Sequence, residues 1–147
     1  VLRPADQIET IECWQLALEA TDRPTVLALT RQAVPFLRTA AEAENRSARG
    51  GYVLKEAEGK RDVTLIATGS EVGLAAEAAE ILAEDGIRAA IDAGVEMGWR
   101  RILRPDDVFV GLSDFGASAP AGALFEHFGL TAKRAAEVVR GLVSRGS

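Results

Sequence analysis

The sequence predicts an α/β fold in which a mostly parallel sheet is flanked by helices. Two observations support this class. Short apolar runs alternate with segments of helical apolar spacing in the carboxyl-terminal two-thirds of the 147-residue chain. A stretch that contains Pro35, a run of Ala and Glu, and Gly50-Gly51 separates this alternation from a helix and a strand nearer the N-terminus. We therefore expect two units, residues 1–50 and residues 51–147.

The first unit contains one predicted helix and one predicted strand. Pro4 suits the first turn of a helix over residues 5–20, in which apolar residues recur at near-helical spacing. Residues 25–30 (TVLALT) are a short apolar run that indicates a buried strand, which ends at the charged Arg31. We interpret residues 32–51, where the pattern dissolves, as a linker that crosses a surface.

Strands and helices alternate in the second unit. Residues 63–67 (VTLIA) indicate a buried strand, and Thr68 and Glu71 have the spacing of a capping box for the helix that follows and ends near Gly86. The other predicted elements are a short strand with a turn at 52–60, strands at 87–91 and 108–112, and helices at 93–103, 120–127 and from the N-cap Thr131 onward. This alternation implies parallel strands.

Composition excludes several classes of function. Hydrophobic residues make up 48% and charged residues 27%, which is typical of a folded domain. The net charge of -5, without a cluster of basic and aromatic residues, argues against nucleic-acid and anionic-membrane partners. No apolar run approaches the length of about 18 residues that spans a bilayer. Residues 1–10 lack signal-peptide order, and Cys13 is a lone thiol, so we expect a cytoplasmic protein.

Arg31 is the best candidate for a ligand contact. Ligands of open α/β sheets bind beyond the carboxyl ends of the strands, and Arg31 directly follows such an end. Its guanidinium is a planar fork of donors that matches phosphate or carboxylate oxygens. The alternative is a buried salt bridge to one of the 22 acidic residues.

Other candidates have simpler structural interpretations. The turn at residues 68–71 could bind an anion through backbone N–H groups, but helix capping is favoured because Glu71 is itself negative. The small-residue loop 115–120 can approach a ligand or a neighbouring subunit, and we favour packing. His127 suits the C-terminus of a helix, and Cys13 suits a core. We expect a turn rather than a metal loop at residues 84–86, and we assign no catalytic or metal-binding residue.

Several segments, in order, resemble the carboxyl-terminal part of the transketolase family. They cover nearly the whole chain. They are Arg3-Pro4-Ala5-Asp6 with Glu9-Thr10 and Cys13-Trp14, Leu29-Thr30-Arg31-Gln32, Ser47-Ala48-Arg49-Gly50 with Tyr52-Val53-Leu54, Ala67-Thr68-Gly69-Ser70-Glu71-Val72, Gly98-Trp99, and Phe115-Gly116-Ala117-Ser118-Ala119-Pro120 with His127-Phe128-Gly129. The resemblance implies that residues 1–50 are the end of a pyrimidine-binding domain with its connector, and that residues 51–147 are the family's C-terminal domain, shortened.

The resemblance also implies a chemical setting. Transketolases of the pentose phosphate pathway transfer a two-carbon ketol unit between sugar phosphates. They use thiamine diphosphate and a divalent metal, Mg or Ca, in a cleft between two subunits of a homodimer. Arg31 matches the arginine of the family's Ser-Arg-Gln element, which helps to hold the substrate phosphate, and Thr30 replaces the serine.

Two departures from the family pattern bear on activity. The cofactor-activating glutamate, the metal-binding Gly-Asp-Gly element and the catalytic histidines have no counterpart in this sequence, so we expect the chain to bind no cofactor alone. A strand end, a crossover helix and a strand start, roughly 30 residues at ordinary element lengths, are missing between Ile91 and Asp92. We expect activity only with the remaining transketolase domains.

Two other hypotheses remain open. The chain could be a non-catalytic module for dimerisation or for binding a small anion at residues 68–71 or 115–120. It could also be an unrelated enzyme that uses His127 and Cys13, although the expected fold separates these two residues.

Overall fold

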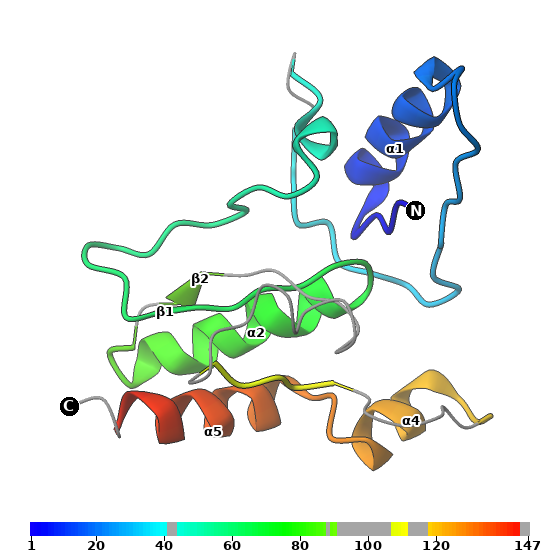
Figure 1. The fold of residues 1–147 in the computed structure, drawn as a ribbon. Coiled ribbons are helices and arrows are strands. Elements are labelled where there is room, and N and C mark those ends of the chain that lie inside the picture. The colour runs from blue at the N-terminus through cyan, green and yellow to red at the C-terminus, as the bar shows by residue number, and fades with distance from the viewer. Residues whose placement is uncertain (41–43, 88, 91–106, 112–117, 145–147) are drawn as a thin grey trace.

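The computed structural model describes residues 1–40, 44–87, 89–90, 107–111 and 118–144. Helix α1 and the 3-10 helix η1 lie in the upper part of Figure 1, and the remaining elements lie below them. The elements are α1 (Gln7–Glu19), η1 (Arg46–Arg49), β1 (Val63–Thr64), α2 (Glu71–Glu84), β2 (Ala89–Ala90), α4 (Ala121–His127) and α5 (Ala132–Val143). The chain is thus an α/β fragment, as predicted.

Strand β1 precedes α2 in the sequence and β2 follows it, and the two strands pair in parallel. Val63 pairs with Ala89 and Thr64 with Ala90. A parallel pair needs a crossover, and α2 supplies it. The predicted parallel order is confirmed for these two strands. Strand β1 is shorter than predicted, and no strand forms within 52–60 or 107–111.

Helix α1 begins at a polar cap. Asp6 is the N-cap, and its carboxylate accepts a hydrogen bond from the backbone N–H of Glu9 at 2.9 Å. Pro4 therefore precedes the helix instead of standing in its first turn. The predicted apolar stripe of Ile8, Ile11, Trp14 and Leu18 is not the buried face. Ile8 is half-buried, and Ile11 (63%), Trp14 (51%) and Leu18 (75%) remain exposed. The residues that α1 does bury are Glu12 and Cys13.

A buried ion pair ties α1 to the stretch that follows residue 32. Nη2 of Arg38 lies 2.8 Å from Oε1 of Glu12, and the two side chains are 5% and 9% exposed. The N–H and the hydroxyl of Ser47 donate to Oε2 of Glu12 at 3.1 and 2.7 Å. The N–H of Arg38 donates to Oδ2 of Asp6 at 3.0 Å. This part of the predicted linker is therefore anchored on α1.

The partners of Glu12 also control its ionisation. Burial alone would raise the pKa of this carboxyl group, but the hydrogen bonds from Arg38 and Ser47 outweigh burial and lower the pKa to about 2. Glu12 is therefore an anion in the folded protein at neutral pH.

Residues 25–30 are extended but do not form the expected buried strand. A single parallel bridge joins Leu27 to Leu2. The N–H of Leu2 donates to the carbonyl of Val26 at 2.8 Å, and the N–H of Ala28 donates to the carbonyl of Leu2 at 2.9 Å. Val26 and Leu29 are 57% and 54% exposed. The apolar run predicted the extended backbone correctly and its burial wrongly, because burial requires neighbours on both sides.

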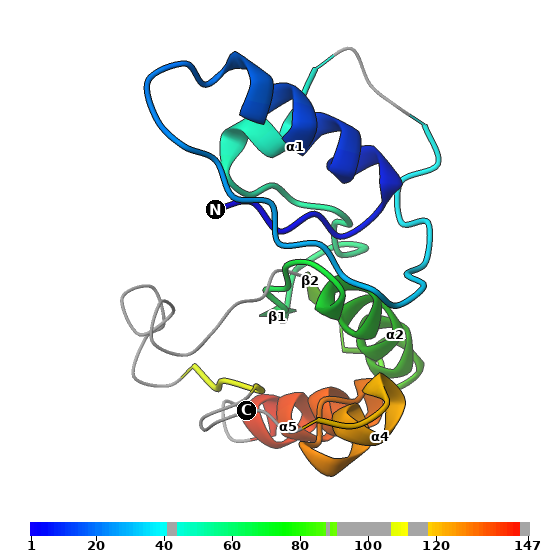
Figure 2. The same ribbon diagram turned by 90° about the vertical axis from the view of Figure 1, so that its right-hand side faces the viewer.

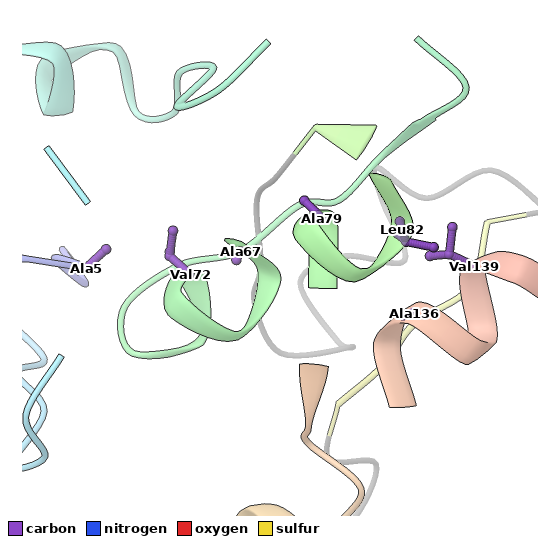
Figure 3. Packing of buried hydrophobic residues seen from close by; sticks show 7 residues of the cluster. All are labelled: Ala5, Ala67, Val72, Ala79, Leu82, Ala136 and Val139. Atoms are coloured by element: carbon purple, nitrogen blue, oxygen red, sulfur yellow. The ribbon is translucent and has the colours of Figure 1, made fainter. Parts of the chain in front are cut away.

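The main core lies where α2 packs against α5. Figure 3 shows its members, with Ala5 of the first half beside Val72 of α2, and Leu82 of α2 facing Val139 of α5. Ala67, Ala79 and Ala136 complete the cluster. The apolar spacing of Val72, Ala75, Ala76, Ala79 and Leu82 predicts one inward face of α2, and these residues are buried in this core or packed against it. Ala5 belongs to the same cluster and connects the two halves of the structure.

The caps of the later helices confirm one prediction and correct another. Thr131 caps α5, since its side chain accepts from the N–H of Arg134 at 3.2 Å. Ser70 is the N-cap residue of α2 but makes no cap hydrogen bond with its side chain, so the predicted capping box is absent there. Gly86 has φ +74°, as the turn after α2 requires. Helix α4 follows Pro120, as predicted. The helix expected at 93–103 lies outside the described residues.

We predict that Glu12→Gln destabilises the protein by about 3 kcal/mol at pH 7, because it leaves the buried Arg38 cation without a counter-charge. Glu137→Gln breaks an exposed pair with Arg134 and should change stability by less than about 1 kcal/mol. Urea unfolding of both variants measures the difference.

A carboxyl group whose pKa is lowered on folding stabilises the folded protein at pH values above its ordinary pKa of 4.5, and this contribution is lost as the pH falls toward 2. Glu12→Gln should therefore show a flatter pH profile in that range, and an unchanged profile would contradict the assignment.

Candidate functional site

Arg31 stands in a short polar turn at the end of the extended segment. The hydroxyl of Thr30 donates to Oε1 of Gln32, and the backbone N–H of Gln32 donates back to the Thr30 hydroxyl at 3.2 Å. These bonds hold the backbone on both sides of Arg31. Its own side chain is exposed, and it forms no hydrogen bond or ion pair with the described residues. The alternative of a buried salt bridge is therefore wrong, and the guanidinium is available to a ligand.

A shallow pocket of about 290 Å³ lies beside this turn. It is formed by the start of α1 and by residues on either side of Arg31, including Asp6, Gln7, Thr10, Thr30, Gln32 and Phe36. Both carboxylate oxygens of Asp6 already accept backbone N–H groups, and the Thr10 hydroxyl donates to the Asp6 carbonyl at 2.7 Å. The Asp6 carboxylate and the Thr10 hydroxyl in this pocket are therefore already hydrogen-bonded within the chain. Arg31 does not line the pocket, but the preceding residue, Thr30, does.

The turn before α2 docks the two halves of the chain together. Gly69 has φ +58°, and its N–H donates to the carbonyl of Arg3 at 3.1 Å. Nη2 of Arg3 lies 3.2 Å from Oε2 of Glu71. The buried hydroxyl of Thr68 has no hydrogen-bond partner among the described groups. Glu71 therefore pairs with Arg3 rather than capping α2, which corrects the interpretation of this turn as an ordinary cap.

Cys13 and His127 do not form a catalytic pair. Cys13 is buried in α1, where burial raises the pKa of its thiol. His127 is exposed at the end of α4 and contacts the ring of Phe128 edge-on, with ring centres 4.9 Å apart. Figures 1 and 2 place α1 and α4 at opposite ends of the molecule. A Cys–His nucleophile is therefore excluded.

Neither a metal cluster nor a membrane span is found in the described part of the chain. No group of three or more His, Cys, Asp or Glu side chains there could hold a metal ion. None of the described helices is both long enough and apolar enough to cross a bilayer. Residues 115–117 of the loop predicted at 115–120 lie outside the described ranges.

The polar cluster around Tyr52 was hardly predictable from the sequence pattern. The guanidinium groups of Arg38 and Arg46 lie 5.4 and 5.5 Å from the centre of the Tyr52 ring. The Tyr52 hydroxyl donates to Oε1 of Glu9 at 2.6 Å. Burial and this carboxylate raise the pKa of Tyr52. Charged residues are usually solvated, so their pattern predicts no cluster. The one available indication was Glu12 beside Cys13, because a carboxylate on the buried side of a helix needs a partner.

Comparison with known proteins identifies the family. The sequence model described as "Transketolase-like TK C-terminal domain" matches residues 50–92 and 87–131. The chain belongs to the transketolase family. A transketolase of Sinorhizobium medicae is 49% identical over 162 aligned residues, covering 90% of this chain and 23% of that protein. The resemblance drawn from the sequence motifs is confirmed.

Solved transketolase structures share this fold. The enzyme from Leishmania mexicana superimposes with a TM-score of 0.81 and 30% identity, over 98% of this chain and 25% of its own. The Pichia stipitis transketolase, solved in complex with sedoheptulose 7-phosphate, gives a TM-score of 0.76 and 33% identity, over 97% and 25%. The chain spans about a quarter of the length of the curated relatives it matches.

The same comparisons agree with the predicted internal deletion. The alignment with the Sinorhizobium transketolase covers 162 positions, whereas 90% of 147 residues is about 132. About 30 positions of that relative therefore have no counterpart in this chain. The two stretches that match the family model meet at residues 87–92, which is where Ile91 and Asp92 stand.

We predict that Thr68→Val leaves the free energy of unfolding unchanged or raises it by up to about 1 kcal/mol. The substitution removes a buried hydroxyl that has no partner among the described groups. Thr10→Val is the matched control, because it removes a hydroxyl that donates at 2.7 Å and should cost about 1 kcal/mol. Thermal or urea unfolding of both variants tests the pair. A larger loss for Thr68→Val than for Thr10→Val would show that the Thr68 hydroxyl is bonded.

Proposed function

We propose that this chain is the carboxyl-terminal portion of a thiamine-diphosphate-dependent ketol transferase. Residues 1–50 would then form the end of the pyrimidine-binding domain with the connector, and residues 51–147 a shortened C-terminal domain. The ordered similarity to transketolases along nearly the whole chain carries this proposal. The ligand named for the Pichia protein, sedoheptulose 7-phosphate, supports a sugar phosphate as the class of substrate.

Arg31 is the residue of this chain that we assign to substrate binding. Its exposed guanidinium follows Thr30 in a turn that keeps the backbone fixed. A guanidinium offers two parallel N–H donors to phosphate oxygens, and such charge-assisted bonds are stronger than neutral ones. Its role is to bind and orient the phosphate end of the sugar, away from the bond that is made or broken.

The residues of this chain do not fit the cofactor or the divalent metal. The sequence has no Gly-Asp-Gly element and a single histidine, and the described part holds no cluster of metal ligands. We expect these 147 residues to show no ketol transfer alone, and to contribute to it when other transketolase domains supply the cofactor site.

Exposed apolar side chains support a need for such a partner. They gather on α1 and on the segment 25–36, and they are Ile11, Trp14, Leu18, Val26, Leu29 and Phe36, each more than half exposed. Several large apolar side chains left exposed in one half of a chain favour an interface. The remaining transketolase domains or a second copy of the chain would cover it. We place this assembly in the cytoplasm.

The same surface favours one other function, a non-catalytic assembly module. Such a module would form dimers without any upstream chain, which sedimentation would detect. A module that binds small anions would also show a melting temperature that rises with phosphate esters, since a ligand that binds only the folded state stabilises it.

We predict that this chain restores ketol transfer when it is mixed with a polypeptide carrying the first three-quarters of the Sinorhizobium transketolase. The assay follows transfer from a ketose phosphate, with each polypeptide alone as a blank. In the mixture, Arg31→Ala should lower kcat/KM for the phosphorylated donor by about 10- to 100-fold, because two charge-assisted bonds are lost. Arg23→Ala, which removes another exposed arginine from the same half, should leave it unchanged.

Full activity of the 147-residue chain alone would contradict the proposal. Equal kcat/KM values for the Arg31→Ala and Arg23→Ala mixtures would remove the role of Arg31 and leave the family assignment in place.

A further inference from the structure

A proline of the Arg31 segment rests directly on a glycine of α2. A Cβ atom added to Gly73 would lie 3.0 Å from Cγ and 3.1 Å from Cδ of Pro35. Gly73 is buried in the first turn of α2, where glycine is less favourable than alanine by up to about 1 kcal/mol. The close approach of the Pro35 ring explains why a residue without a side chain stands there.

The other end of the same segment is anchored on α1. The N–H of Arg38 donates to Asp6, and the Arg38 guanidinium pairs with Glu12. Leu37 packs against the core cluster that contains Val72. Residues 31–38 are thus held by α1 at one end and by α2 at Pro35. The anchor at Pro35 is therefore supplied by α2, which belongs to the carboxyl-terminal half of the chain.

Pro35 is a stiff anchor. The pyrrolidine ring fixes φ, so a displacement of its Cγ and Cδ atoms must move the backbone that carries them. Pro35 is four residues from Arg31, and the intervening Gln32 is bonded to Thr30. A shift of the proline by a few tenths of an ångström is therefore passed to the turn from which the Arg31 side chain projects.

We propose that Gly73 is a positioning residue for Arg31, through its contact with Pro35. The carboxyl-terminal half of the chain, to which no catalytic group is assigned, thereby sets the direction of the phosphate-binding guanidinium. This inference rests on the proposed function of Arg31 and adds to it a residue that touches neither substrate nor cofactor.

The test compares Gly73→Ala with Gly141→Ala in the 147-residue chain. Gly141 lies in α5, and nothing stands within 4 Å of the position of its missing Cβ, so it gains helix propensity without a clash. The chain, labelled with ¹⁵N, is titrated with inorganic phosphate and with fructose 6-phosphate, and NMR follows the Nε–H signal of Arg31 and the amides of residues 31–36. The fitted Kd and the melting temperature are recorded for each variant.

We expect Gly73→Ala to shift the amides of residues 31–36 before ligand is added and to raise the Kd for fructose 6-phosphate by about three- to tenfold. Gly141→Ala should leave both unchanged. In a Pro35→Ala background the ring is absent, so adding Gly73→Ala should have no further effect on Kd. This non-additivity separates positioning from a general loss of stability, which would lower the melting temperature without changing the Arg31 signal.

The outcomes distinguish this inference from the function on which it rests. If Arg31→Ala weakens binding and Gly73→Ala does not, positioning by Gly73 is overturned and the role of Arg31 stands. If Arg31→Ala binds both ligands as the unmodified chain does, the role of Arg31 fails and the positioning proposal falls with it.

Discussion

The buried ion pair between Glu12 and Arg38 is the contact on which the first half of the structure depends. Two charges removed from water must meet each other closely, and here Ser47 donates two further hydrogen bonds to the Glu12 carboxylate and Asp6 accepts the backbone N–H of Arg38. The buried Nε of Arg38 has no hydrogen-bond partner among the described groups. The pair fixes where the chain crosses α1 after the Arg31 turn. That crossing delivers Leu37 to the core of the second half and Pro35 to α2.

Helices were the part of the fold that could be predicted from the sequence. Apolar spacing and caps act within a few residues, so α1, α2, α4 and α5 fall close to their predicted ranges, and Thr131 caps α5 as expected. Burial could not be predicted in the same way. Val26 and Leu29 have the side chains of a buried strand, but only Leu2 pairs with their segment among the described residues. The pairing of Glu71 with Arg3 likewise depends on a residue far away in the sequence.

In the candidate site, too, only the residue with a local sequence pattern could be predicted. Arg31 could be selected because a guanidinium after an apolar run is a local pattern with a clear chemical meaning. Pro35 and Gly73 gave no such pattern, since neither residue type signals a ligand and their contact joins distant parts of the chain. Arg38 gave no such pattern either, because isolated charges in a sequence usually belong to the solvated surface, and Glu12 was indicated only by its place beside Cys13.

The core between α2 and α5 is built largely from the smallest apolar side chain. Four of the seven residues in its central cluster are alanines, and Leu82 is the one large side chain buried completely in the described ranges. Such a core lets helix backbones approach closely but hides little hydrocarbon from water. Unfolding then exposes little new apolar area, which reduces both the heat-capacity increment and the denaturant m-value. Unfolding in urea would therefore extend over a broad range of denaturant concentration instead of occurring in a sharp transition.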